Sequence, residues 1–141
     1  MALEPVFESF RNIVDEAISP LAFAPVEPDQ AAHLNDLGKP DRDGKFFVAQ
    51  IGEEIVGFMA VSLDEAKKTG EIGLNAVHQS HAGQGLGARL NSFAIAIMRN
   101  AGMRLATMGT GGDPSHAPAR RIYEKVGFGA AIPSVWLYKL L

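Results

Sequence analysis

Two hydrophobic periods alternate along this chain, and each change of period marks the edge of a predicted element. Apolar residues recur at helical spacing over residues 5–18 and again over 28–37, which predicts two helices near the N-terminus. Between residues 45 and 77 the apolar positions fall in short runs separated by turn residues, a pattern typical of strands. This region predicts three strands, at residues 45–51, 54–63 and 71–77.

Short turns join these elements. Only Gly52-Glu53 separates the first two strands, so we expect an antiparallel hairpin there. After the third strand and a glycine-rich turn, an apolar stripe predicts a helix that Gly102 ends. The stripe consists of Leu86, Leu90, Phe93, Ile97 and Met98.

The rest of the chain predicts a strand at 103–108, another helix and a closing strand at 135–141. Ser115 can cap that helix, Pro118 suits its first turn and Gly127 stops it. The resulting order, α-α-β-β-β-α-β-α-β, predicts an α/β (α+β) domain in which helices cover a mixed sheet.

Composition places the chain among ordinary globular proteins. Its 141 residues suit one domain, with 47% hydrophobic and 21% charged residues. It has no apolar run of the ~20 residues that span a membrane and no secretory pattern, so we expect a cytoplasmic protein with no membrane partner. The absence of cysteine excludes disulfides, thiolate metal sites and a cysteine nucleophile, and we expect no metal.

Charge is unevenly distributed along the sequence. The net charge of −3 argues against non-specific nucleic-acid binding. Residues 1–44 hold nine acids and three bases, whereas the remaining residues hold seven acids and ten bases. The glycine-rich turn lies in the basic part, which suits an anionic ligand, although ordinary scatter over a solvated surface explains the charges equally well.

Gly83, Gly85 and Gly87 stand at alternate positions between the third strand and the helix. Glycine lets backbone N–H groups approach a ligand, and a helix N-terminus adds unpaired N–H groups, so the turn could seat a phosphate. A dinucleotide loop would follow the first strand of its unit, and a Walker loop would contain Gly-Lys-Ser/Thr; this turn does neither. The alternative is a turn that only lets the helix pack closely on a strand.

A second motif helps to distinguish between these interpretations of the glycine-rich turn. Residues 119–128, Ala-Arg-Arg-Ile-Tyr-Glu-Lys-Val-Gly-Phe, begin 32 positions after Gly87. With the strand 71–77 and the glycine-rich turn, they make the chain resemble the GNAT N-acetyltransferase superfamily from about Phe46 to Leu141. The segment 111–121 looks like that of a bacterial subgroup of unassigned substrate.

The resemblance implies a mixed, mostly antiparallel sheet, splayed at the cofactor site and flanked by helices on both faces. It implies a single domain over 1–141, with acceptor-side helices at about 5–38 and an acetyl-CoA-binding core at about 46–141. The implied activity is transfer of an acetyl group from acetyl-CoA directly to a primary amine of a small molecule or peptide.

The resemblance also implies two catalytic residues. Tyr123 is the general acid that protonates the departing CoA thiolate; alternatively, it is a helix tyrosine that packs on the sheet. Glu71 is the general base, and its even spacing from Val77 predicts that both face the same side of the strand. Alternatively, Glu71 is an exposed acid at a strand start, and His78, His116 or water serves as base.

For acetyl-CoA, the resemblance implies that turn amides hold the pyrophosphate and that the pantetheine arm lies along the end of the third strand. Arg89 and Arg121 are further phosphate candidates. The cofactor-binding candidates are Ala76, Val77, Gly83, Gln84, Gly85, Gly87, Ala88, His116 and Arg120.

The sequence departs from the family at Ala82, where Arg or Gln is usual; His81 or Gln84 could replace the missing side chain. A non-catalytic CoA-binding or regulatory module on the same fold therefore stays open, as does an enzyme that binds a nucleotide. The apolar residues at 135–137 could form the edge of a homodimer, or they could be buried in the core.

Overall fold

The computed structural model describes Ile13 and residues 44–141. The two helices predicted at the N-terminus lie outside the described residues, apart from Ile13, which is helical and exposed. The described strands are β1 (Gly44–Ile51), β2 (Glu54–Asp64), β3 (Thr69–Val77) and β4 (Leu105–Met108). The described helices are α4 (Leu86–Asn100) and α5 (Ala117–Lys125), with single 3-10 turns η1 (Gln79–His81) and η2 (Pro114–His116).

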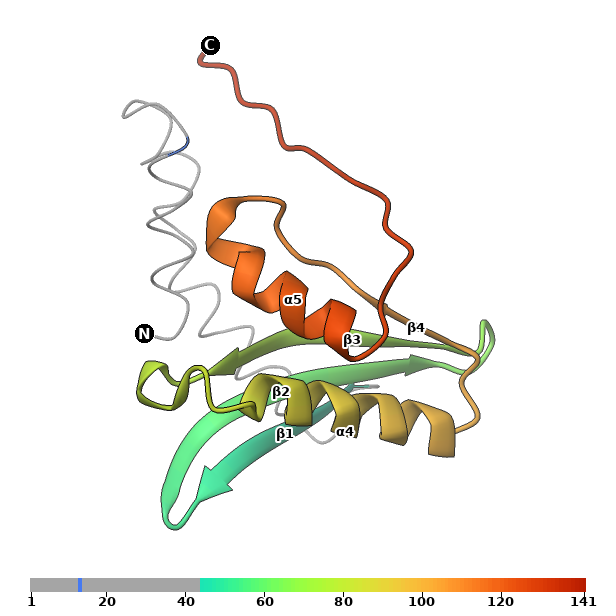
Figure 1. Cartoon of the computed structure of the whole chain (residues 1–141). Helices are drawn as coiled ribbons and strands as arrows, with labels where there is room; N and C mark the ends of the chain where they lie inside the picture. Colours follow the sequence, from blue (N-terminus) through green and yellow to red (C-terminus); the bar gives the residue numbers. More distant parts are fainter. Residues whose placement is uncertain (1–12, 14–43) are drawn as a thin grey trace.

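The strands form one mixed sheet in the order β1-β2-β3-β4 (Figure 1). β1 and β2 form the predicted hairpin, in which Gly52 adopts a left-handed φ of +61° that glycine takes at little cost. β2 and β3 are also antiparallel, and β3 and β4 are parallel. The prediction of a mixed, mostly antiparallel sheet is therefore confirmed.

A bulge interrupts β3. Val61 lies opposite Ile72 and Met59 lies opposite Asn75, so Gly73 and Leu74 share the single partner position of Ala60. One extra residue in a strand moves every later side chain to the other face of the sheet.

The bulge changes the face on which Glu71 lies. Ile72 and Val77 both pack into the core although they are five residues apart, and Glu71, beside Ile72, lies on the opposite face. The prediction that Glu71 and Val77 share a face is wrong because strict alternation holds only in a strand without a bulge.

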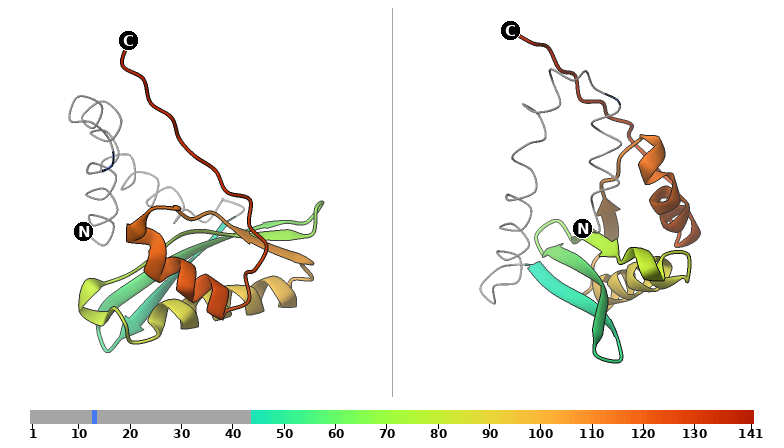
Figure 2. Two further views of the ribbon diagram at one scale, coloured as in Figure 1. Left: turned by 45° about the horizontal axis from the view of Figure 1, so that its top comes forward. Right: turned by 90° about the vertical axis from the view of Figure 1, so that its left-hand side faces the viewer.

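The core lies between the sheet and α4, and α5 packs against α4 (Figure 2). Gly102, with a φ of +76°, follows the end of α4 as predicted. The predicted stripe is confirmed at Leu90 and Met98, whereas Phe93 is 49% exposed and touches the ring of Phe47 edge-on. The buried core comprises Met59, Val61, Ile72, Leu90, Ala94 and Met98.

Two predictions near the C-terminus are wrong. Ser115 does not cap α5: the carboxylate of Asp113 accepts the N–H of Ser115 and starts η2, and α5 begins only at Ala117. No strand forms at 135–141, where the chain is extended without a pairing partner among the described strands (Figure 1). None of the described helices is long and apolar enough to cross a membrane.

Candidate functional site

β3 and β4 separate halfway along β3. β4 pairs with β3 only from Thr69 to Ile72, and β3 then continues through Gly73–Val77 with no β4 partner among the described residues. The glycine-rich turn and the start of α4 follow directly from this unpaired half, and α5 begins on the same side of the molecule (Figure 1). The sheet is therefore splayed where the sequence resemblance places the acyl donor.

The turn before α4 leaves room for a ligand at two of its glycines. Gly83 and Gly85 have φ values of +75° and +82°, and a Cβ on either would meet no atom within 4 Å. α4 begins at Leu86, and no side chain caps it. Its first N–H groups therefore keep the unmet hydrogen-bonding capacity and positive dipole end that favour an anion.

Gly87 has a different role from these two glycines. A Cβ on Gly87 would lie 2.8 Å from Cδ1 of Ile122 on α5, so the absence of a side chain lets the two helices touch. Both interpretations of the glycines thus apply: Gly83 and Gly85 open the turn, and Gly87 permits close packing.

Most polar side chains of the turn make hydrogen bonds within the turn itself. His78 Nδ1 lies 2.7 Å from Ser80 Oγ, and Gln84 Nε2 lies 3.5 Å from the Ser80 carbonyl oxygen. His81 Nε2 lies 3.6 Å from a carboxylate oxygen of Glu54, the first residue of β2. Ala82 adds no polar side chain to the turn.

Tyr123 sits on α5 against the bulged half of β3. Burial raises the pKa of Tyr123 above its ordinary value, and a hydrogen bond from the side chain of Asn75 acts in the opposite direction with smaller effect. The ring of Phe128 meets that of Tyr123 edge-on, with centroids 6.4 Å apart. The phenol therefore keeps its proton at neutral pH and can act as a proton donor.

An acid–histidine pair precedes α5. Asp113 Oδ1 lies 2.6 Å from His116 Nδ1, and the other carboxylate oxygen of Asp113 accepts hydrogen bonds from the N–H and hydroxyl of Ser115. Because a carboxylate only accepts, the pairing places a proton on Nδ1 of His116.

Arg120 holds the segment that carries this pair. Its guanidinium donates to the carbonyl oxygens of Gly111 and Asp113, at 2.5 and 2.9 Å. These contacts of His116 and Arg120 lie within the chain, and the predicted binding of acetyl-CoA by both residues stays a prediction. Sequence reasoning missed Asp113. An aspartate two residues before Ser115 and three before His116 is placed to accept local hydrogen bonds, and this spacing could have identified it.

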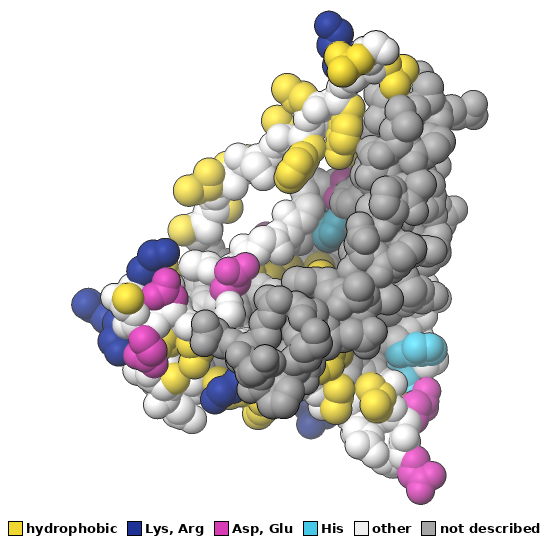
Figure 3. All heavy atoms as spheres, turned by 180° about the vertical axis from the view of Figure 1, so that it is seen from behind, with side chains coloured by type: hydrophobic (Ala, Val, Ile, Leu, Met, Phe, Trp, Pro, Cys, Tyr) yellow, Lys and Arg dark blue, Asp and Glu magenta, His cyan; other side chains and the backbone are white. Residues whose placement is uncertain are grey.

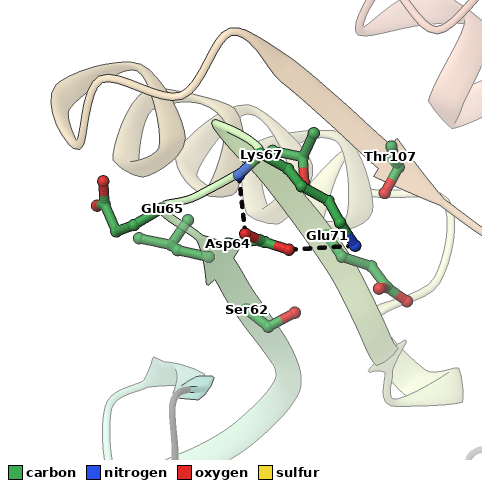
Figure 4. A pocket seen from close by; sticks show the side chains of 8 residues that line it. Ser62, Asp64, Glu65, Lys67, Glu71 and Thr107 are labelled. Carbon is green, nitrogen blue, oxygen red and sulfur yellow. Dashed lines mark hydrogen bonds and ion pairs between the residues drawn. The ribbon is translucent and has the colours of Figure 1, made fainter.

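Glu71 lines a pocket of about 620 Å³ on the face of the sheet opposite α4 (Figure 4). Backbone hydrogen bonding from Lys67, helped by its side chain, lowers the pKa of Asp64, and Lys68 pairs with Glu65 at 2.6 Å. The carboxylate of Glu71 makes no hydrogen bond or ion pair with any residue in the described part of the chain. The lining residues are Ser62, Leu63, Asp64, Glu65, Lys67, Thr69, Glu71 and Thr107.

The two predicted catalytic residues thus lie on opposite sides of β3. Tyr123 approaches Asn75 from the side of α4 and α5, whereas Glu71 faces the pocket on the other side.

Comparison with known proteins agrees with this geometry. A sequence profile of the Acetyltransferase (GNAT) family matches residues 8–128. A mycothiol acetyltransferase of Streptomyces bingchenggensis is 34% identical over 130 residues, which cover 85% of this chain and 41% of that protein. The chain therefore spans less than half the length of this curated relative.

Solved structures share the fold. An acetyltransferase of Bacillus subtilis in complex with CoA matches with a TM-score of 0.57 at 25% identity, over 73% of this chain and 61% of the other. A transcriptional regulator of Bacillus halodurans matches with a TM-score of 0.64 at 26% identity, over 82% and 79% of the two chains. With its splayed sheet, its open glycine turn and a family profile that spans most of its length, the chain belongs to the GNAT family of acetyltransferases.

Proposed function

We propose that this protein is an N-acetyltransferase that uses acetyl-CoA and transfers the acetyl group directly to a primary amine of a small molecule or peptide. The observation that carries the proposal is the place of Tyr123, a phenol that is protonated at neutral pH and lies against the unpaired half of β3. Family membership and the likeness to a CoA-bound acetyltransferase support it.

The donor's pyrophosphate would bind the turn before α4. Gly83 and Gly85 leave space there, and the N–H groups of Gln84, Gly87 and Ala88 belong to the turn and the uncapped first turn of α4. The backbone of Ala76-Val77 would hold the pantetheine arm, because this part of β3 has no β4 partner among the described residues.

Acetyl-CoA supplies an activated acyl group. The chain would contribute position and proton transfer. Glu71 accepts a proton from the substrate ammonium, directly or through water, so that the free amine can attack the thioester carbonyl; as the C–S bond breaks, Tyr123 gives a proton to the leaving sulfur. A chain without cysteine offers no thiol for an acetyl-enzyme, which favours direct attack by the amine.

Replacing Tyr123 by Phe tests the proposal. The variant should acetylate amines about 10²- to 10⁴-fold more slowly, the usual contribution of general acid–base catalysis, while calorimetry shows unchanged acetyl-CoA affinity. Tyr138 is the other tyrosine of the chain, so Tyr138→Phe is the matched control and should retain activity. Equal activity of the wild type and the Tyr123→Phe variant would contradict the assigned role.

A non-catalytic CoA-binding or regulatory module is the second candidate. Ala82 removes a polar side chain from the turn, and one solved protein of this fold is described as a transcriptional regulator. If a broad panel of amines remains unacetylated while acetyl-CoA binds, the module replaces the enzyme. Calorimetry with acetyl-CoA, ATP and NAD tests ligand choice, and tighter binding of ATP or NAD would contradict both candidates.

A further inference from the structure

The pocket that Glu71 lines carries both signs of charge. This pocket of about 620 Å³, which we call the Glu71 pocket, lies on the face of the sheet opposite α4 and is large enough for a small molecule. Its lining includes the carboxylates of Asp64, Glu65 and Glu71 and the ammonium of Lys67. Figure 3 shows the molecule from behind, with basic and acidic side chains intermingled at the end of the sheet where β2 turns into β3. The pairing of these charges decides what the pocket can bind.

Two of the three carboxylates already have a lysine partner. Asp64 accepts the backbone N–H of Lys67 at 2.9 Å, and its other carboxylate oxygen lies 3.4 Å from Lys67 Nζ. The hydrogen bond from the backbone lowers the pKa of Asp64, so this carboxylate is ionised at neutral pH. Glu65 pairs with Lys68 at 2.6 Å, whereas the carboxylate of Glu71 has no such partner in the described part of the chain. Glu71 is therefore the carboxylate whose charge the chain leaves unbalanced.

The side chain of Lys67 reaches along the pocket. It extends from the turn between β2 and β3 toward Glu71, with Asp64 next to it (Figure 4). The side chain is 77% exposed, so its attraction to Asp64, and not packing, decides its position. Its ammonium therefore adds a positive charge at the place where Asp64 would otherwise attract a cationic group of a ligand.

These charges favour a ligand with a single positive charge. A primary amine reaches the pocket as an ammonium, because aliphatic amines have pKa values of about 10. One ammonium at Glu71 neutralises the carboxylate that has no partner. A second cationic group on the same ligand would have to displace Lys67 from Asp64 or lie close to its ammonium, and both are unfavourable.

We propose that Lys67 determines acceptor specificity: it restricts the Glu71 pocket to amines whose only positive charge is the reacting ammonium, and it disfavours diamines and other polycations. The inference rests on the proposed transfer to an amine and adds the charge class of the acceptor. Lys67 acts on the choice of substrate and takes no part in the proton transfers proposed for Glu71 and Tyr123.

Matched acceptors test the role of Lys67. The pair 1,4-diaminobutane and 4-amino-1-butanol, and the corresponding pair 1,5-diaminopentane and 5-amino-1-pentanol, differ in whether the far end of the molecule is charged. The wild type should prefer the amino alcohols. Lys67→Met removes the charge and nearly keeps the length of the side chain. It should raise kcat/KM for the diamines relative to the amino alcohols about fivefold, mainly through KM, which is the effect of one unit charge over about 4 Å in water.

Two further variants separate charge from shape. Lys67→Arg retains the positive charge and should keep the wild-type preference. Lys125→Met removes a lysine charge at the end of α5, away from the residues that line the pocket, and should leave the preference unchanged. The gain in Lys67→Met should shrink as the salt concentration rises, because the charges are exposed to solvent.

Calorimetry with the CoA-bound protein measures the same preference without turnover, and Lys67→Met should bind 1,4-diaminobutane about fivefold more tightly than the wild type. A wild-type preference for diamines would overturn the inference, and so would the absence of any difference between the wild type and Lys67→Met in both measurements. If amino alcohols are acetylated under those results, the proposed transfer still stands. If calorimetry shows the expected dependence on Lys67 while no amine is acetylated, the proposed transfer fails and the charge selectivity of the pocket stands.

Discussion

The side chain of Asn75, in the bulged half of β3, lies near Tyr123 on α5 and lowers the pKa of its phenol. Burial raises that pKa more strongly, so the net pKa of Tyr123 is raised. This placement depends on the bulge at Gly73 and Leu74, which turns Asn75 toward the helices.

The raised pKa of Tyr123 makes stability depend on pH at the alkaline end. Above the ordinary value of 10.0 the unfolded chain loses this proton while the folded chain retains it. The contribution to stability is therefore present below pH 10 and declines as pH rises toward the folded pKa. Denaturant unfolding of the wild type should show a steeper fall in free energy above pH 10 than that of Tyr123→Phe. Tyr138→Phe retains Tyr123 and should fall as steeply as the wild type.

Gly111 leaves the space that the acid–histidine pair occupies. A Cβ there would overlap the carboxylate of Asp113 and approach His116 Cε1 to 2.7 Å, so Gly111→Ala should displace the pair and lower the free energy of unfolding by about 1–3 kcal/mol. Gly112→Ala is the matched control, because a Cβ at Gly112 meets no atom within 4 Å. Thermal unfolding measures both; equal midpoints would show that the pair adjusts without cost.

Ala82 is the position at which a gain of function is expected. Ala82 has an extended backbone that any residue can adopt, so Ala82→Arg should fold normally. The new guanidinium should strengthen acetyl-CoA binding by up to about tenfold, which corresponds to about 1.4 kcal/mol. Calorimetry measures the affinity, and Ala130→Arg adds the same charge at an exposed residue after α5 as a control. An equal effect of both variants would indicate a general charge effect rather than a contact in the turn.

Glu71 and Glu65 line the same pocket and offer a matched comparison. Glu71→Gln should lower kcat for acetylation about 10²-fold or more, with unchanged acetyl-CoA affinity, because the amide cannot accept a proton. Glu65→Gln should retain most activity, since Glu65 pairs with Lys68 at 2.6 Å. Similar losses in both variants would point to the pocket's overall charge and away from a specific base.

Local signals were sufficient for much of the fold. Gly52-Glu53 predicted the hairpin because a two-residue turn with glycine limits the connection to few geometries. Gly102 and Gly127 marked helix ends because both adopt left-handed φ values, of +76° and +105°.

The wrong predictions concern features that depend on residues close in space but not adjacent in the sequence. The bulge in β3 depends on how β2 pairs with it, and nothing in residues 71–77 alone announces an extra position. Ser115 and Asp113 are both residue types that cap helices, and in the structure Asp113 accepts the N–H of Ser115 and also contacts His116. Residues 135–141 have the residue types of a strand, but a strand forms only when its backbone pairs with another, and no described strand pairs with this segment.

For the candidate site, sequence reasoning named Tyr123, Glu71 and the glycine turn but assigned Glu71 to the wrong face of β3. Whether a strand side chain points to one face of the sheet or to the other follows from strand pairing and packing, which a single sequence does not encode locally. The structure adds Asn75 and Asp113 to the candidate site. Asn75 acts on Tyr123, 48 positions later in the sequence, and Asp113 contacts His116, three positions later.

The contact between Gly87 and Ile122 has a consequence for engineering and for evolutionary change. It brings the helix that follows the glycine turn against the helix that carries Tyr123 with no room for a side chain at Gly87, so the position of each helix depends on the other. A transplant of either helix alone into a related enzyme would misalign the other. The unit that can be exchanged between relatives is therefore the whole segment from Gly83 to Phe128, with both helices and the strand between them.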